Sequence, residues 1–178
     1  DAAVIENACR ETKGVVSIAN YNCPGQIVIT GEEEAVAKAS EKLKELGARR
    51  IVPLKVSGPF HSAMLTGAGE KLAEVLEGVN VREPKIPYIT NVTAEYVTEA
   101  SQVKDLLVRQ VSSSVKWQQC VEKMITDGTD TFVEIGPGKT LSGFMRKISR
   151  DVKMLNIQTV EDFGKTAEAL KNRASEVE

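Results

Sequence analysis

The sequence predicts an α/β protein in two parts: a small subdomain over residues 1–56 and a larger α/β part with a parallel sheet over residues 57–178. Helical and strand periodicities alternate along the whole chain. Residues 1–56 follow the order α-β-β-α-β, which lacks only a leading strand to be a ferredoxin-like unit. In the second part helices separate the strands, an order typical of a parallel sheet with helices on both faces.

The small subdomain begins with a short amphipathic helix and a predicted hairpin. Its strongest element is the next helix, in which Val36, Ala39 and Leu43 share one face and Gly47 follows as the C-terminal cap. Pro53 interrupts the last strand and favours an edge position or a bulge. In chain order we expect a helix at 2–12, a strand at 15–19, a turn-rich connection at 20–26, a strand at 27–30, a helix at 32–46 and a strand at 50–56.

The second part begins after a seam at residues 56–60, the kind of junction at which sites often form. The Gly136-Pro137-Gly138 turn links a buried type of strand to the helix that follows it. We expect helices at 63–76, 102–110, 115–126, 140–148 and 160–173, strands at 88–91, 131–135 and 152–157, and a loop at 78–87.

Composition limits the possible classes of function. The 178 residues are 42% hydrophobic and 27% charged, as in an ordinary globular chain, and a net charge of −2 gives no case for nucleic-acid binding. No apolar run approaches the length of a membrane span, and no signal peptide is evident. Three widely spaced cysteines and one histidine make no zinc pattern and predict reduced thiols, hence a cytoplasmic protein without a metal.

The single histidine, His61, lies between an apolar stretch and a helix, and Ser62 beside it can cap that helix. Such an imidazole is a candidate general base if an acceptor on its second nitrogen holds one tautomer. A structural histidine is the alternative that these residues leave open. No Gly-x-Ser-x-Gly nucleophile elbow occurs in the chain, so the base is present without its usual hydroxyl partner.

Three further features each have a functional and a structural interpretation. The glycine-rich turn after Glu134 can present backbone N–H groups to an anion, or serve only as a tight strand-to-helix turn, which we favour. Asn20 and Asn22 can line a pocket or serve a turn. Arg146 and Arg150, four residues apart on one predicted helix face, form with neighbouring basic residues the main cationic cluster, either for an acidic partner or as a solvated surface. Its other members are Lys139, Lys147 and Lys153.

Several stretches resemble, in order and spacing, the malonyl-CoA:acyl carrier protein transacylases of bacterial type II fatty-acid synthesis. They cover almost the whole chain: ANYNCPGQIVI at 19–29, GARR at 47–50, PLKVSGPFH at 53–61, LVRQ at 107–110 and EIGPGKTLSG at 134–143. The resemblance implies the C-terminal portion of such an enzyme, with residues 57–178 as part of an α/β-hydrolase-like acyltransferase core.

The resemblance also assigns roles. In this family a serine on a Gly-His-Ser-Leu-Gly elbow carries the malonyl group from coenzyme A to the phosphopantetheine thiol of the carrier protein. His61 matches the base that activates this serine, and Gln110 matches the residue whose main-chain carbonyl orients it. Asn20 and Asn22 match an Asn-x-Asn pair near the substrate.

Phe60 matches an aromatic residue that crowds a 2-methyl branch. The serine elbow, the oxyanion segment and the malonate-binding arginine are then expected before Asp1. The implied partners are malonyl-CoA and acyl carrier protein, which the Arg146, Lys147 and Arg150 surface would receive. Coenzyme A is a substrate carrier rather than a cofactor, and the complete protein is expected to be a monomer.

Two other functions remain open from the sequence. Residues 1–56 could be a ferredoxin-like regulatory module that binds a small molecule, in which case His61 would have no catalytic role. The chain could also belong to an acyltransferase with a different acyl donor. Replacing His61 in the complete protein separates the enzyme from the binding module.

Overall fold

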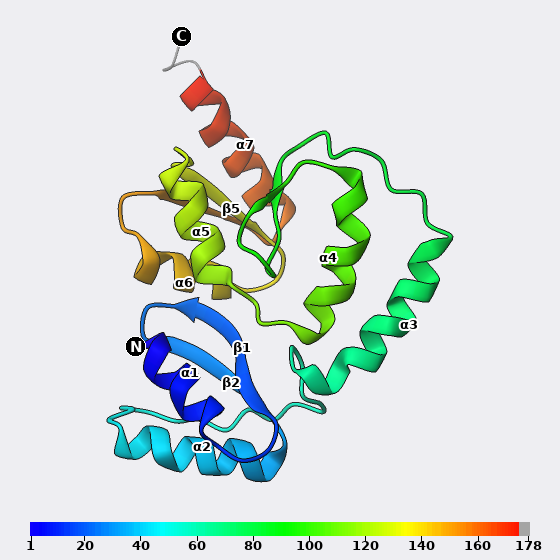
Figure 1. The fold of residues 1–178 in the computed structure, drawn as a ribbon. Helices are drawn as coiled ribbons and strands as arrows, with labels where there is room; N and C mark the ends of the chain where they lie inside the picture. The colour runs from blue at the N-terminus through cyan, green and yellow to red at the C-terminus, as the bar shows by residue number, and fades with distance from the viewer. Residues whose placement is uncertain (175–178) are drawn as a thin grey trace. The chain divides into compact units, whose positions relative to one another are not determined.

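The computed structural model describes residues 1–174, and the chain forms two compact units, Asp1–Cys120 and Val121–Glu178 (Figure 1). The first unit ends inside helix α5 (Trp117–Thr126). The division that the sequence predicts at residue 56 falls within the first unit and stays a prediction.

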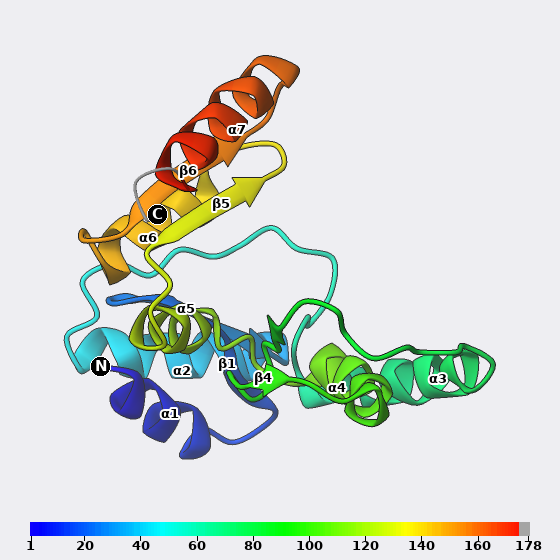
Figure 2. The ribbon, with the colours of Figure 1, turned by 90° about the horizontal axis from the view of Figure 1, so that it is seen from above.

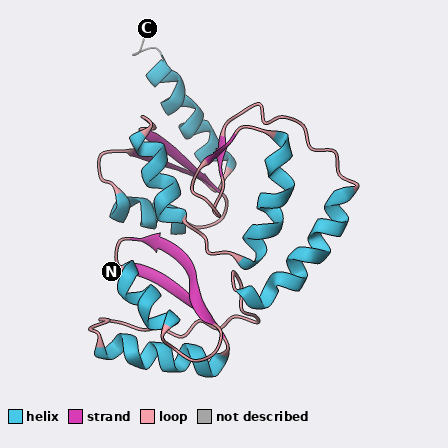
Figure 3. Ribbon diagram, viewed as in Figure 1, coloured by secondary structure: helices cyan, strands magenta, loops and turns pink. Residues whose placement is uncertain are grey.

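The first unit is built around an antiparallel hairpin of β1 (Val16–Cys23) and β2 (Gln26–Gly31). Helices α1 (Ala2–Arg10) and α2 (Glu33–Glu45) pack against it (Figures 1 and 3). The predicted connection at 20–26 is wrong, because β1 continues through Cys23 and a two-residue turn suffices. Gly25, at φ +76, provides the left-handed conformation that this turn needs. The predicted helices are confirmed.

Helix α2 ends as expected at a glycine. Gly47 has φ +93, its N–H donates to the carbonyl of Lys44, and the N–H of Ala48 donates to that of Leu43. This pair of hydrogen bonds is a Schellman motif, which satisfies carbonyls that the helix end leaves free.

The strand predicted at 50–56 is not formed, and the prediction of five elements in the order α-β-β-α-β is therefore wrong for this structure. Residues 50–56 run without regular structure, and their side chains are exposed, including Val52 at 52% and Leu54 at 58%. A strand requires a partner for its backbone N–H and C=O groups, and β1 and β2 pair with each other here. The apolar side chains of the predicted strand face solvent instead of a sheet.

The rest of the first unit is a pair of packed helices with a small hairpin. A 3₁₀ turn η1 (Ala63–Leu65) leads into α3 (Thr66–Glu77), which lies beside α4 (Ala100–Ser112) in both views (Figures 1 and 2). Between them, β3 (Tyr88–Ile89) pairs antiparallel with β4 (Tyr96–Val97). The sequence placed β3 in a parallel sheet and missed β4, whose two residues give no periodic signal.

The core beside α4 consists of Val92, Val97 and Leu106, with Val103 packed against them. This cluster positions α4 and therefore the residues at its C-terminal end. The close packing of α3 against α4 also holds α4 in place. A Cβ on Gly69 of α3 would lie only 3.1 Å from the carbonyl oxygen of Val108 in α4.

The second unit contains the predicted parallel strands. Strand β5 (Thr131–Ile135) pairs with β6 (Lys153–Ile157) in register from Thr131↔Lys153 to Ile135↔Ile157, which confirms a parallel pairing. Helices α6 (Thr140–Ile148) and α7 (Val160–Ala174) both pack against β6. A crossover through α6 joins the two strands, as a parallel pair requires.

Candidate active site

His61 is held by a hydrogen bond to the end of helix α4. Its Nδ1 lies 3.0 Å from the carbonyl oxygen of Gln110, 49 residues away in sequence. A carbonyl oxygen can only accept, so Nδ1 carries a proton, and in the neutral ring Nε2 then holds the lone pair. The ring is therefore fixed in the tautomer that a general base needs.

The Gln110 carbonyl is available because it belongs to the last turn of α4, whose final four carbonyls have no partner within the helix. The C-terminus of a helix also carries partial negative charge. It therefore favours an N–H donor, such as the Nδ1–H of His61, at this end of α4.

The backbone at His61 has an unusual conformation. Its φ is +58, a left-handed value that costs a non-glycine residue of order 1 kcal/mol. Directly after it, Ser62 is fully buried and its Oγ accepts a hydrogen bond from the N–H of Met64, which caps η1. The buried Ser62 cap fixes the backbone next to His61 and therefore the direction in which the imidazole side chain points. Phe60, on the other side, is 54% exposed.

Asn20 and Asn22 lie on strand β1 rather than in the turn that the sequence indicated. They are two residues apart, and bulges at Ala19 and Asn22 interrupt the regular alternation of side chains along β1. Both are half-buried, and their side chains make no hydrogen bond among the described residues. No hydrogen bond joins either of them to His61 in the part of the chain described.

The glycine-rich turn after β5 binds a carboxylate of its own chain. The Glu134 side chain accepts hydrogen bonds from the N–H groups of Leu141, at 3.0 Å, and Ser142, at 2.8 Å, and also from the Ser142 hydroxyl. Burial raises the pKa of Glu134, but these bonds and the charge of Lys139 outweigh it and hold the pKa below its usual 4.5. The N–H groups at the start of α6 are thus already occupied.

Side-chain amides close the same turn from the other side. Asn156 donates to the carbonyls of Glu134 and Gly138, and Gln158 accepts from the N–H of Gly138 at 3.0 Å. The structural interpretation of this turn, favoured from the sequence, is the one that the geometry supports.

The cationic residues belong to the second unit. Arg146 and Lys147 are in the last turn of α6, while Arg150 lies beyond its end, because Ser149 is extended at φ −146 and ψ 146. The expectation that Arg146 and Arg150 share a helix face is therefore wrong. Both arginines are exposed.

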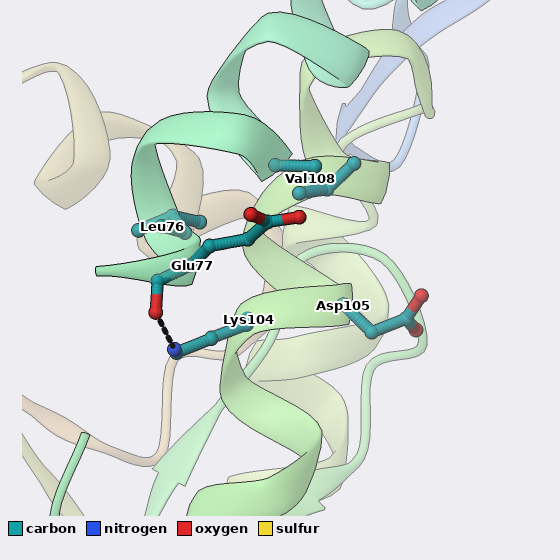
Figure 4. Close-up of a pocket in the computed structure, with 6 residues that line it drawn as sticks. Leu76, Glu77, Lys104, Asp105 and Val108 are labelled. Atoms are coloured by element: carbon teal, nitrogen blue, oxygen red, sulfur yellow. Dashed lines mark hydrogen bonds between the residues drawn. The ribbon is translucent and has the colours of Figure 1, made fainter. Parts of the chain in front are cut away.

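An open groove of about 440 Å³ lies between α3 and α4 (Figure 4). Its wall is mixed in character: Leu76 and Val108 are apolar, and Lys104 donates to the carbonyl of Glu77 at 3.4 Å. His61 is not among its lining residues, so this groove is separate from the histidine.

Neither a metal centre nor a membrane helix is found in the part of the chain that the structure describes. No group of three or more histidine, cysteine or acidic side chains could hold a metal ion there. No helix among residues 1–174 is both long and apolar enough to span a bilayer. The three cysteines are buried thiols, and burial raises the pKa of Cys120 to about 11.

Comparison with known proteins identifies the family to which this chain belongs. Residues 1–172 match the acyl transferase domain family, and the chain belongs to that family.

The individual relatives have more specific names than the family. The malonyl CoA-acyl carrier protein transacylase of Bacillus subtilis is 44% identical over 161 residues, covering 90% of this chain and 51% of the relative. The crystal structure of MCAT from Streptococcus pneumoniae superposes with a TM-score of 0.90 at 41% identity, covering 94% of this chain and 55% of that one.

A third similar structure is a type II PKS acyl-carrier protein in complex with its malonyl-transacylase. It has a TM-score of 0.87 at 37% identity and covers 91% of this chain and 53% of that one. The chain spans about half the length of the curated relatives it matches.

The structure brings together only some of the residues that the sequence singled out. His61 and Gln110 meet, and Phe60 directly precedes His61 in sequence. The sequence reasoning overlooked two contacts: the carboxylate of Glu134 at the start of α6, and the contact of Ser114 with β1. The only sequence signal of the Ser114 contact was the run of three consecutive serines between two predicted helices.

Proposed function

We propose that the complete protein is a malonyl-CoA:acyl carrier protein transacylase of fatty-acid synthesis. It transfers a malonyl group from coenzyme A to the phosphopantetheine thiol of an acyl carrier protein. The hydrogen bond between His61 Nδ1 and the Gln110 carbonyl carries this proposal, because it selects the tautomer in which Nε2 can act as the base. The relatives named above support the choice of substrate and partner.

The mechanism is ping-pong. A serine hydroxyl, supplied by polypeptide outside this chain, gives its proton to His61 Nε2 while its oxygen attacks the malonyl thioester carbonyl. The imidazolium then returns the proton to the coenzyme A thiolate as it leaves. In the second half the carrier-protein thiol gives its proton to His61 while its sulfur attacks the serine ester. The malonyl group passes to the sulfur, and the imidazolium returns the proton to the serine oxygen as it leaves. The Gln110 carbonyl holds the ring through both halves.

Three further roles belong to the same proposal. Asn20 and Asn22 contact substrate from β1, where their amides are free to do so. Phe60 narrows the acyl site against a 2-methyl branch. Arg146, Lys147 and Arg150 receive the acidic carrier protein, and long-range attraction between exposed charges speeds this association.

The architecture proposed for the complete protein is a ferredoxin-like small subdomain that includes residues 1–56, and an α/β-hydrolase-like core that includes residues 57–178. The exposed apolar side chains at 50–56 support it, because a neighbouring strand would cover them and allow that segment to pair. The protein is proposed to act as a cytoplasmic monomer, without metal or nucleic acid.

A direct assay tests the function. The complete protein, malonyl-CoA and holo-acyl carrier protein are mixed, and malonyl-carrier protein is followed by mass spectrometry. Turnover is expected from the complete protein and not from residues 1–178 alone, since they contain no nucleophile elbow. Absence of turnover from the complete protein with malonyl-CoA, but turnover with another acyl-CoA, would favour an acyltransferase of different donor. Absence with every donor would favour the binding module.

A further inference from the structure

Three hydrogen bonds connect the segment after helix α4 to strand β1. The Ser114 hydroxyl donates to the carbonyl of Ile18 at 2.5 Å, although the two residues are 96 positions apart. The N–H of Val115 donates to the carbonyl of Ala19 at 2.7 Å, and its own carbonyl accepts from the N–H of Tyr21 at 2.9 Å. Residues 113–115 are therefore fixed against a strand that does not neighbour them in sequence.

This attachment coincides with the end of α4. The helix stops at Ser112, and Ser113 is extended at φ −108 and ψ 154. In an α-helix each carbonyl accepts from the N–H four residues later, so a longer α4 would bring the N–H of Ser114 to the Gln110 carbonyl. That is the carbonyl to which His61 donates. The next helical turn would also occupy the end of α4 where the imidazole lies.

We infer that Ser114 is a positioning residue for His61. Together with the two main-chain bonds of Val115, its hydroxyl, bound to Ile18, holds the segment against β1, ends α4 at Ser112 and leaves the Gln110 carbonyl to the imidazole. The geometric part of this inference stands by itself. Its consequence for turnover rests on the proposed function.

Two substitutions in the complete protein separate helix termination from other roles of the hydroxyl. Ser114→Ala removes the bond to Ile18 and introduces the strongest helix former. Ser114→Pro removes the hydroxyl too, but proline has no N–H to give to the Gln110 carbonyl and favours an extended residue before it, as Ser113 already is. The Ser114 N–H makes no hydrogen bond among the described residues, so proline removes none. Ser113→Ala is the matched control.

The readout is the tautomer of His61, measured by ¹⁵N NMR of histidine-labelled protein and assigned with the spectrum of His61→Gln. Wild type, Ser113→Ala and Ser114→Pro are expected to keep the proton on Nδ1, and Ser114→Ala to show a mixture of tautomers. kcat of Ser114→Ala should fall by about tenfold, less than the 10²–10⁴-fold that loss of a base costs, and that of Ser114→Pro should stay within about threefold of wild type.

A wild-type tautomer in Ser114→Ala would overturn the inference, as would a mixture in Ser114→Pro. If Ser114→Ala does not fold, the proline variant alone decides. A wild-type tautomer in Ser114→Pro would support the inference, and a mixture of tautomers would overturn it. Failure of the proposed function is distinguishable, because a wild-type protein without transacylase activity still reports the tautomer.

Discussion

His61 donates a hydrogen bond from Nδ1 to the main-chain carbonyl of Gln110, 3.0 Å away. The acceptor is a backbone atom at a helix end, so its position depends on how α4 packs and where it stops, and not on the identity of the Gln110 side chain. Changes to the packing of α4 should therefore act on the histidine from a distance.

The contact between α3 and α4 gives the first prediction. Gly69→Ala places a Cβ 3.1 Å from the Val108 carbonyl, which is backbone and gives way poorly. We expect a loss of about 1–3 kcal/mol in the free energy of unfolding from overpacking. Gly67→Ala, in the same helix with open space around it, should gain up to about 1 kcal/mol. Urea unfolding of both variants measures this, and equal effects would contradict the close packing.

The Glu134 carboxylate predicts a pH-dependent contribution to stability. Its pKa is lowered in the folded state, so it stabilises the protein above about pH 4.5, and this contribution is lost as the pH falls through the folded-state pKa. Glu134→Gln should therefore cost about 1 kcal/mol at pH 7, as loss of a helix cap does. The cost should shrink toward pH 3. Unfolding curves at both pH values check this, with the exposed Glu168→Gln as control; a cost that does not vary with pH would argue against it.

The basic residues at the end of α6 and just beyond it predict a salt-dependent carrier-protein KM. Reversing Arg146 and Arg150 to glutamate should raise that KM severalfold at low salt and much less at high salt, since ions screen exposed charges over about 8–10 Å. The KM for malonyl-CoA should change less. The double variant Lys71→Glu/Lys85→Glu, at two exposed lysines of the first unit, is the charge-matched control. An unchanged carrier-protein KM would remove these residues from the docking surface.

Phe60 predicts acyl selectivity. Its side chain is 54% exposed and lies next to the base in sequence, so Phe60→Ala should leave the fold intact and open space beside the acyl group. We expect the ratio of kcat/KM for methylmalonyl-CoA to that for malonyl-CoA to rise by about 10-fold or more, the size typical of one methyl group in a pocket. Competition between the two donors measures the ratio directly. No change would mean that Phe60 does not face the acyl site.

The sequence predicted the regular helices and the β5–β6 pair well, because their periodicity is local. It was wrong at 50–56, where an apolar run indicates a strand but cannot supply the neighbouring strand that its backbone needs. It also ended the first strand at residue 19, although β1 continues to Cys23, and it counted Arg150 on the face of a helix that it expected to end at 148. Such failures concern partners and stopping points, which depend on tertiary contacts.

At the candidate site too, local features could be predicted from the sequence and tertiary contacts could not. His61 stood out because it is the only histidine in the chain, and the family resemblance indicated the Gln110 carbonyl as its acceptor. The attachment of Ser114 to Ile18 was not predictable, because a serine between two helices has many possible acceptors. Only the fold brings β1 to it.

The most direct test of the account is kcat of His61→Ala in the complete protein, with malonyl-CoA and holo-carrier protein as substrates. A fall of about 10²–10⁴-fold, with wild-type unfolding behaviour, is the predicted result, because the serine would lose its base. Activity within a few fold of wild type would contradict the assignment of His61 as that base.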